Sequence, residues 1–168
     1  PHYRTNPTNT LPIMKYLLTL LVLSLFGCQT DQMTAEEPVM ESPLVEYLMT
    51  PSANSEGPFS SGVRVGNMLF LSGKIGTVPE TGQLIEGGIL PESRQVMDNI
   101  KATLEELGSR LENVVKCTVM IDDIAQWGAF NEIYVEYFPG PNPARSAFGA
   151  DGLALGAAIG VECWAAMP

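Results

Sequence analysis

The chain has 168 residues, the length of a single domain, and its 19 acidic and 9 basic side chains give a net charge of −10 at pH 7. This acidic balance argues against nucleic acids and anionic lipid surfaces as partners, because both repel a negatively charged protein. The one histidine is His2, outside the part expected to fold, and no Gly-Lys-Ser/Thr loop occurs. The sequence therefore disfavours chemistry that depends on histidine, namely zinc, Ser-His and phosphodiester chemistry, and it also disfavours P-loop chemistry.

The N-terminal part has the pattern of a bacterial lipoprotein signal peptide. After Lys15 comes an apolar run, residues 17–26, which is shorter than the roughly 20 residues that span a bilayer but long enough for the apolar region of a signal peptide. It ends in Leu25-Phe26-Gly27-Cys28, which resembles a lipobox, where the cysteine is acylated. We therefore expect residues 1–27 to be upstream sequence (1–13) and signal peptide, and Cys28 to be lipidated. The protein would be an exported bacterial lipoprotein, periplasmic or attached to the outer membrane, and would contact the membrane only through this anchor.

Residues 28–51 are rich in acidic residues and proline, which predicts a flexible tether, and residues 52–168 then form the folded domain. Loss of Arg4 and Lys15 with the signal peptide would leave seven basic side chains against all 19 acidic ones, a net charge near −12. An anionic ligand would then have to be captured by local positive groups.

The predicted elements of the domain follow a ββαβαββ order. A hairpin of Val63–Val65 and Met68–Ile75 turns at Gly66-Asn67, and a loop over 77–88 leads to a helix that opens at Pro91 and ends at Gly108. A strand over Val114–Ile121 follows, and Asp122 or Asp123 caps a second helix. Strands near Ser146–Phe148 and Ala158–Ala166 complete the set.

This order predicts an α+β fold, one sheet with both helices on one face. The second helix carries an aromatic stripe, which we interpret as core, formed by Trp127, Phe130, Ile133, Tyr134 and Tyr137. The last strand is apolar on nearly every residue, so the sheet face without helices needs a cover. Self-association would supply it, and the clefts between subunits would be natural ligand sites.

Cys117 and Cys163 each lie in an alternating strand pattern. Two cysteines can pair in an oxidising compartment. We favour buried, unpaired thiols, because each cysteine falls on an apolar strand face.

Arg145 lies in Pro143-Ala144-Arg145-Ser146, a turn bounded by proline and glycine between the aromatic helix and the last strand. Its guanidinium offers a planar fork of donors, which suits a carboxylate or phosphate. A structural arginine held by backbone carbonyls or by an acidic side chain remains an equal alternative.

Taken together, these segments resemble the RidA (YjgF) family, and the resemblance covers about residues 52–168. The matching stretches are Gly57–Ser60, Val65–Gly73, Arg94–Lys101, Val114–Val119, Phe130–Tyr134 and Pro143–Ser146. The resemblance implies a chorismate-mutase-like fold and a homotrimer with a ligand cleft between subunits. It also implies hydrolysis of reactive enamines and imines to 2-keto acids and ammonia without cofactor or metal.

The resemblance assigns roles to individual residues. Arg145 matches the arginine that binds the substrate carboxylate, Ser72 and Gly73 match residues that line the cleft, and Asn131 matches an asparagine of the second helix. Ala147 stands where many members have cysteine, a position that contributes chiefly backbone.

Several positions depart from the family pattern. Phe59 lacks the hydroxyl of the usual tyrosine, and Lys74 and Gly76 replace a common glutamine and proline. The glutamate that positions the attacking water is replaced by Gly160, whereas Glu162 matches the second acid of the Glu-hydrophobic-Glu pair. Glu162 points to the same face as Gly160 but lies about 7 Å further along the strand.

Two functions remain open from the sequence. The first is imine hydrolysis, weakened by Gly160, in which Arg145 binds the substrate and Glu162 or backbone groups orient water. Glu162 as an acid satisfied by backbone or by a neighbouring subunit is an equal alternative. The second function is a non-catalytic trimer that binds a small carboxylate metabolite. A ribonuclease is disfavoured by the charge and by the lack of histidine.

Overall fold

The computed structural model describes residues 44–51 and 58–168, all within one compact unit that extends from Ser42 to Pro168. The predicted signal peptide, the lipidation site at Cys28 and residues 28–43 of the tether lie outside the described residues. They stay predictions. In the part of the chain that is described, no helix has the length and apolar character needed to cross a membrane.

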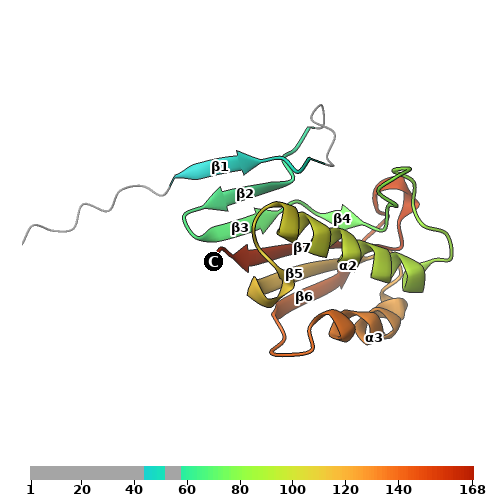
Figure 1. Ribbon diagram of the computed structural model, residues 1–168. Helices are drawn as coiled ribbons and strands as arrows, with labels where there is room; N and C mark the ends of the chain where they lie inside the picture. Colours follow the sequence, from blue (N-terminus) through green and yellow to red (C-terminus); the bar gives the residue numbers. More distant parts are fainter. Residues whose placement is uncertain (1–43, 52–57) are drawn as a thin grey trace, which may run out of the picture. The chain divides into compact units, whose positions relative to one another are not determined.

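The domain is built on one mixed sheet (Figure 1). The strand order is β1-β2-β3-β7-β5-β6, and the short β4 pairs with β7 beyond the end of β3. Pairing is antiparallel throughout except between β5 and β6, which are parallel. The strands are β1 (Val45–Leu48), β2 (Gly62–Val65), β3 (Met68–Leu71), β4 (Lys74–Ile75), β5 (Val114–Ile121), β6 (Ala144–Gly149) and β7 (Ile159–Ala166).

The predicted ββαβαββ order is confirmed, with two differences. The expected second strand of the hairpin is interrupted at Ser72-Gly73, which separates β3 from β4. Strand β1 falls inside the segment assigned to the flexible tether, so that assignment is wrong for residues 45–48. Val45–Leu48 pairs with β2 in regular register, and backbone hydrogen bonding of this kind outweighs the polar composition of the segment.

Two helices, α2 (Ile89–Glu106) and α3 (Trp127–Tyr137), lie on the same face of the sheet, as predicted (Figure 1). Helix α2 begins two residues before the expected Pro91, and Gly108 follows its end with a φ of 83°, a left-handed conformation that suits glycine. The Asp123 carboxylate accepts a hydrogen bond from the Ala125 amide at 3.0 Å, and the short 3-10 turn that it caps leads directly into α3.

The core lies between the helices and the sheet. Strands β3, β5 and β7 contribute alternate residues to it, and α2 contributes positions three or four apart. The fully buried side chains include Leu69, Val96, Met97, Ile100, Leu104, Val119, Ile121, Phe130, Ile159 and Val161.

Cys117 and Cys163 form a disulfide, so the expectation of two free thiols is wrong. The two cysteines are register partners on adjacent antiparallel strands, β5 and β7, with Cα atoms 4.1 Å apart. Both side chains are fully buried on the helix-covered face. Alternation along each strand predicts burial but does not specify which residue of the other strand lies opposite, and here that residue is the second cysteine.

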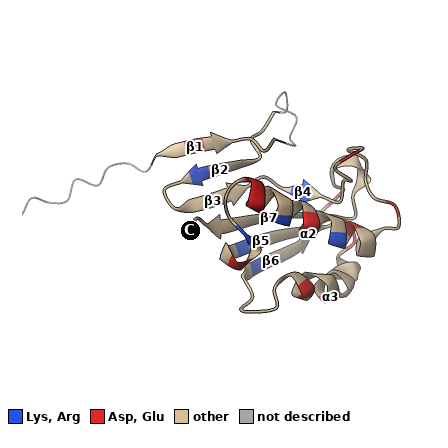
Figure 2. Ribbon diagram, viewed as in Figure 1, with Lys and Arg blue, Asp and Glu red and all other residues tan. Residues whose placement is uncertain are grey.

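The other face of the sheet has no helix over it among the described residues (Figure 1). Trp164 of β7 stacks edge-on against Phe70 of β3 there and remains 40% exposed, and Phe148 of β6 is 49% exposed. The apolar face expected from the last strand is thus present. Basic residues are spread over several elements of the described region, with two of them, Arg94 and Lys101, on α2 (Figure 2).

Candidate functional site

Arg145 lies on β6, an edge strand, rather than in the turn that the flanking proline and glycine suggested. Parallel pairing with β5 sets Arg145 opposite Cys117, whose side chain is buried under the helices. Arg145 therefore projects to the helix-covered face, toward α3. The pattern Pro-Ala-Arg indicated a turn, but the register with β5 extends the strand back to Ala144.

The Arg145 guanidinium is held by α3 without an acidic partner. Its Nη2 donates to Asn131 Oδ1 at 2.6 Å, and its Cζ lies 4.6 Å from the centre of the Tyr134 ring. The rings of Trp127 and Phe130 are within 6 Å, at 5.9 and 5.8 Å. Such aromatic faces attract a cation and orient its planar fork. Neither of the two ion pairs in the described region, Arg94–Glu136 and Arg110–Glu112, includes Arg145, so its charge is free for an anionic ligand.

The guanidinium opens on a pocket of about 420 Å³ between α3 and the loop before β6. Tyr134 lines this pocket, and its hydroxyl is buried and has no hydrogen-bond partner among the described residues. Burial raises the pKa of the Tyr134 phenol and the nearby Arg145 charge opposes that rise, so the hydroxyl stays protonated at neutral pH and can donate. The pocket is lined by Asn131, Tyr134, Val135, Asn142, Pro143 and Arg145.

The helical spacing of Tyr134 and Trp127 is typical of a core stripe, so the sequence did not indicate a site role for either residue. Tyr134 is indeed buried, but it also lines the pocket, and Trp127 is 46% exposed beside Arg145. Two aromatic residues one to two helical turns apart, followed by an arginine after a proline-rich break, are the pattern that could have indicated an aromatic cradle.

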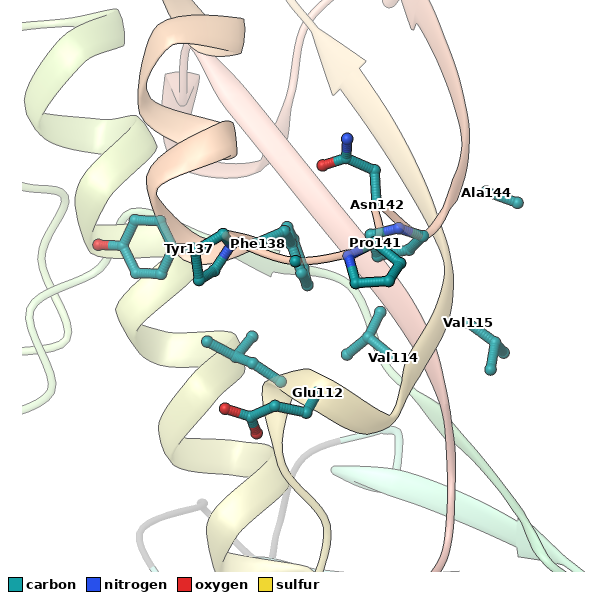
Figure 3. A pocket seen from close by; sticks show the side chains of 12 residues that line it. Glu112, Val114, Val115, Tyr137, Phe138, Pro141, Asn142 and Ala144 are labelled. Atoms are coloured by element: carbon teal, nitrogen blue, oxygen red, sulfur yellow. The ribbon is translucent and has the colours of Figure 1, made fainter.

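A second hollow of about 540 Å³ lies beside this pocket, and Asn142 and Pro143 line both (Figure 3). Its wall is mostly apolar and proline-rich, and Val114, Phe138 and Pro141 face it. The Tyr137 hydroxyl points away toward α2, where it bonds to the Asp98 carboxylate at 2.8 Å. Burial first, and then this bond, raise the pKa of Tyr137 to about 12. The hollow thus offers few polar groups to a ligand.

The other predicted site residues lie around β7. Ser72 and Gly73 occupy the break between β3 and β4, where pairing with β7 is interrupted opposite Glu162 and Cys163. Ser72 Oγ donates to the Ser60 carbonyl at 2.6 Å, and this bond holds the break to the segment just before β2. The exposed Phe59 precedes Ser60 in that segment. Gly73 has open space where a side chain would be, so a ligand can approach its backbone closely.

Glu162 and Gly160 share the face of β7 that carries no helix. Glu162 pairs with Thr118 and Gly160 pairs with Met120. Both pairs alternate with the buried Cys117–Cys163 pair along the strands, so they project to the opposite face. No hydrogen bond or ion pair within the described chain holds the half-buried Glu162 carboxylate. A Cβ built on Gly160 would lie 3.6–3.7 Å from its nearest neighbours, which is ordinary contact, so a Cβ can be added here without a clash.

The predicted residues therefore form two separate groups in one chain. We call Arg145, Asn131 and Tyr134 the arginine half-site, and Ser72, Gly73, Gly160 and Glu162 the β7 half-site. Strand β5 separates β6 from β7, which puts the two strands about 10 Å apart, and Arg145 and Glu162 project to opposite faces. Ala147, two residues after Arg145, shares its face and packs against the core.

Metal ligands are not grouped in the described residues, since no three His, Cys, Asp or Glu side chains there are placed to hold an ion.

Comparison with known proteins identifies the family. The family model described as endoribonuclease L-PSP matches residues 49–167. The chain belongs to the L-PSP family. This is the RidA/YjgF family, so the resemblance seen in the sequence is confirmed.

Relatives in the L-PSP family include two proteins named as deaminases. The human 2-iminobutanoate/2-iminopropanoate deaminase is 40% identical over 106 residues, which are 63% of this chain and 77% of the human protein. The chloroplastic Reactive Intermediate Deaminase A of Arabidopsis thaliana is 40% identical over 111 residues, 66% of this chain and 59% of that protein. The chain thus spans less than two thirds of the Arabidopsis relative.

Solved structures of the L-PSP family confirm the expected α+β, chorismate-mutase-like fold. The YjgF gene product from E. coli has a TM-score of 0.67 and 31% identity, with 73% of this chain and 99% of that chain covered. RidA from an Antarctic Psychrobacter has a TM-score of 0.68 and 34% identity, with 73% and 99% covered.

Proposed function

We propose that this protein hydrolyses reactive enamine or imine carboxylates to 2-keto acids and ammonia. The observation that carries the proposal is the Arg145 guanidinium, which has no acidic partner in the described chain and opens on a pocket. Relatives named 2-iminobutanoate/2-iminopropanoate deaminase support the reaction class.

The chemistry asks for few groups. Arg145 and Asn131 bind the substrate carboxylate, and the Tyr134 hydroxyl donates a further hydrogen bond. Water then adds to the carbon of the protonated C=N group, and collapse of the adduct breaks the C–N bond. The carbon keeps the water oxygen as its carbonyl, and nitrogen leaves as ammonium. Holding substrate and water in one place supplies much of the acceleration.

We infer that a second copy of the chain completes the site, in a homotrimer. The arginine half-site and the β7 half-site point to opposite faces, so one chain cannot offer both to one substrate. The exposed apolar face around Trp164 and Phe148 gives the assembly a surface to bury. Light scattering of the purified domain should report three chains, and a monomer would contradict the assembly.

The placement of the attacking water is the least well supplied part of the proposed reaction. Gly160 supplies no carboxylate, and Glu162 is the acid nearest to it on the same face of β7. A positioned carboxylate contributes about 10²–10⁴-fold to such a step, so we expect slow turnover rather than none.

The test generates the imine in place with an amino-acid oxidase and catalase and follows 2-keto acid formation with and without the protein. We expect acceleration over buffer. No acceleration at any protein concentration would remove the hydrolase and leave the second candidate, a trimer that binds a carboxylate metabolite without converting it. That candidate is favoured by the missing carboxylate at Gly160.

A mixed assembly tests whether the site is shared. Chains carrying Arg145→Ala and chains carrying Glu162→Ala are denatured and refolded together. If the half-sites of different copies face each other, some interfaces regain both intact halves, and activity rises above that of either variant alone. Activity no higher than the mean of the two separate variants would show that the halves do not meet across subunits.

Export as a lipoprotein remains a proposal, supported by the lipobox-like Leu25–Cys28. Growth with a clickable fatty acid should label the wild-type protein and leave Cys28→Ala unlabelled. Equal labelling of the two would contradict the anchor.

A further inference from the structure

A third hollow, of about 290 Å³, lies on the helix-covered side of the sheet, and neither half-site contributes to its wall. Lys74 of β4 pairs with Val161, whose side chain is buried beneath α2, so the Lys74 side chain projects to that side. Helix α2 forms one wall and the loop after β4 forms another. The lining residues are Thr50, Lys74, Thr77, Val78, Pro79, Gly82, Asn99, Ala102, Thr103 and Glu106.

The polar groups near Lys74 are engaged with each other rather than with its amine. Asn99 Nδ2 donates to the carbonyls of Ile75 and Thr77, at 3.0 and 2.8 Å, and Thr103 Oγ1 donates to the Asn99 carbonyl at 2.8 Å. No hydrogen bond or close ion pair to a described residue holds the Lys74 amine.

Burial and charge act on this amine in opposite directions. Partial burial lowers the pKa of Lys74, and the Glu106 carboxylate on α2 works against that effect. A larger share of Lys74 is therefore neutral near pH 7 than for an ordinary lysine, and a neutral amine is the nucleophilic form.

The other described lysines are placed differently. Lys101 projects from α2 into solvent, and Lys116 Nζ donates to Ser146 Oγ at 2.7 Å. Lys74 is thus the described lysine that combines an amine without a hydrogen-bond partner, a hollow to receive a ligand and a nearby carboxylate.

We propose that Lys74 captures small carbonyl compounds, aldehydes or 2-oxo acids, as an imine in this hollow. The amine nitrogen attacks the carbonyl carbon and forms the C–N bond, while the carbonyl electron pair moves to oxygen. The oxygen then leaves as water and takes both amine protons with it, which leaves a C=N bond. No oxidant or further reactant is needed, and a hollow of about 290 Å³, near the lower end of the range for ligand pockets, suits a small ligand.

The site is independent of the proposed hydrolysis. Its carbonyl ligand is charged if it is a 2-oxo acid and neutral if it is an aldehyde. The two sources are separated by using glyoxylate and propanal as alternative probes.

The experiment treats the full chain with each probe and cyanoborohydride near neutral pH and measures the adduct on each lysine by peptide mass spectrometry. We expect Lys74 to react faster than Lys101, because burial leaves a larger share of the Lys74 amine neutral, by about tenfold for each unit by which the Lys74 pKa is lowered. We also expect the Lys74 rate to saturate with probe concentration, because binding precedes reaction, while the Lys101 rate stays linear. Saturation by glyoxylate alone would assign 2-oxo acids, and saturation by propanal alone would assign aldehydes.

A substitution in the wall distinguishes the contribution of the hollow from that of the amine alone. Ala102 is exposed on α2, so Ala102→Leu fills the hollow without touching the core, and it should slow Lys74 labelling and leave Lys101 unchanged. Equal rates at Lys74 and Lys101 in the wild-type chain would overturn the proposal. A linear Lys74 rate, or one unaffected by Ala102→Leu, would overturn it as well.

Discussion

The arginine half-site and the β7 half-site differ in how completely one chain builds them. Arg145 has its orienting partner, its aromatic cradle and its pocket from α3 and β6 alone. The β7 half-site has an open backbone at Gly73, no side chain at Gly160 and a carboxylate at Glu162 with no described partner. The groups proposed to bind the substrate carboxylate thus come from a single chain, whereas in the proposed reaction the placement of water depends on what faces β7.

Restoring an acid at the β7 half-site should give the largest change. Gly160→Glu adds the missing carboxylate where a Cβ has only ordinary contacts, so we expect imine hydrolysis to rise by about 10²–10⁴-fold. The measurement is the initial rate of 2-keto acid formation, with Gly160→Gln as the matched control of similar size. An unchanged rate together with weaker ligand binding would instead favour a repurposed binding protein.

The disulfide joins β7 to β5, the strand that separates the two half-sites, and its reduction should have the next largest effect. It closes a separation of 46 residues, for which the chain-entropy model gives about 4 kcal/mol of unfolding free energy. Denaturant titration with and without a phosphine reductant measures the difference. If Cys117 and Cys163 both react with a thiol reagent in the denatured, unreduced protein, the bond does not form.

Removal of the Arg145 charge should greatly weaken the binding of a carboxylate ligand at the arginine half-site. Arg145→Ala removes charge-assisted hydrogen bonds worth about 1.5–3 kcal/mol each, so we expect affinity for a 2-keto acid to fall about 10²–10³-fold. Calorimetric titration measures the affinity, and Arg110→Ala is the control because Arg110 is exposed and remote from the pocket. An Arg145→Ala protein that binds and turns over like the parent would exclude the half-site as the carboxylate anchor.

The smallest expected effect tests the role of Tyr134. Tyr134→Phe removes a hydroxyl that has no described partner, so the free energy of unfolding should stay the same or rise. Ligand affinity should fall about two- to tenfold, the value of one hydrogen bond. Equal affinity in the two proteins would place the hydroxyl outside the binding contacts.

The sequence predicted the element order because apolar residues recur with helical and strand periods along the chain. It identified Arg145 and Asn131 through motif resemblance, and the structure brings them within hydrogen-bond distance. It could not show that Arg145 and Glu162 lie on opposite faces, since that depends on the register of β6 and β7 with β5. The cysteine pairing depends on the same long-range register. Strand β1 was not predicted, because the acidic residues and prolines around it are typical of a tether.

The cross-strand bond between Cys117 and Cys163 has a consequence for the direction in which Arg145 points. Arg145 lies on β6, which pairs with β5. If β5 shifted by one residue along β7, every β5 side chain would move to the other face of the sheet. A covalent staple between β5 and β7 forbids that slippage. Oxidation thereby fixes the face that each β5 side chain presents, and so keeps constant the strand against which β6 and Arg145 are aligned.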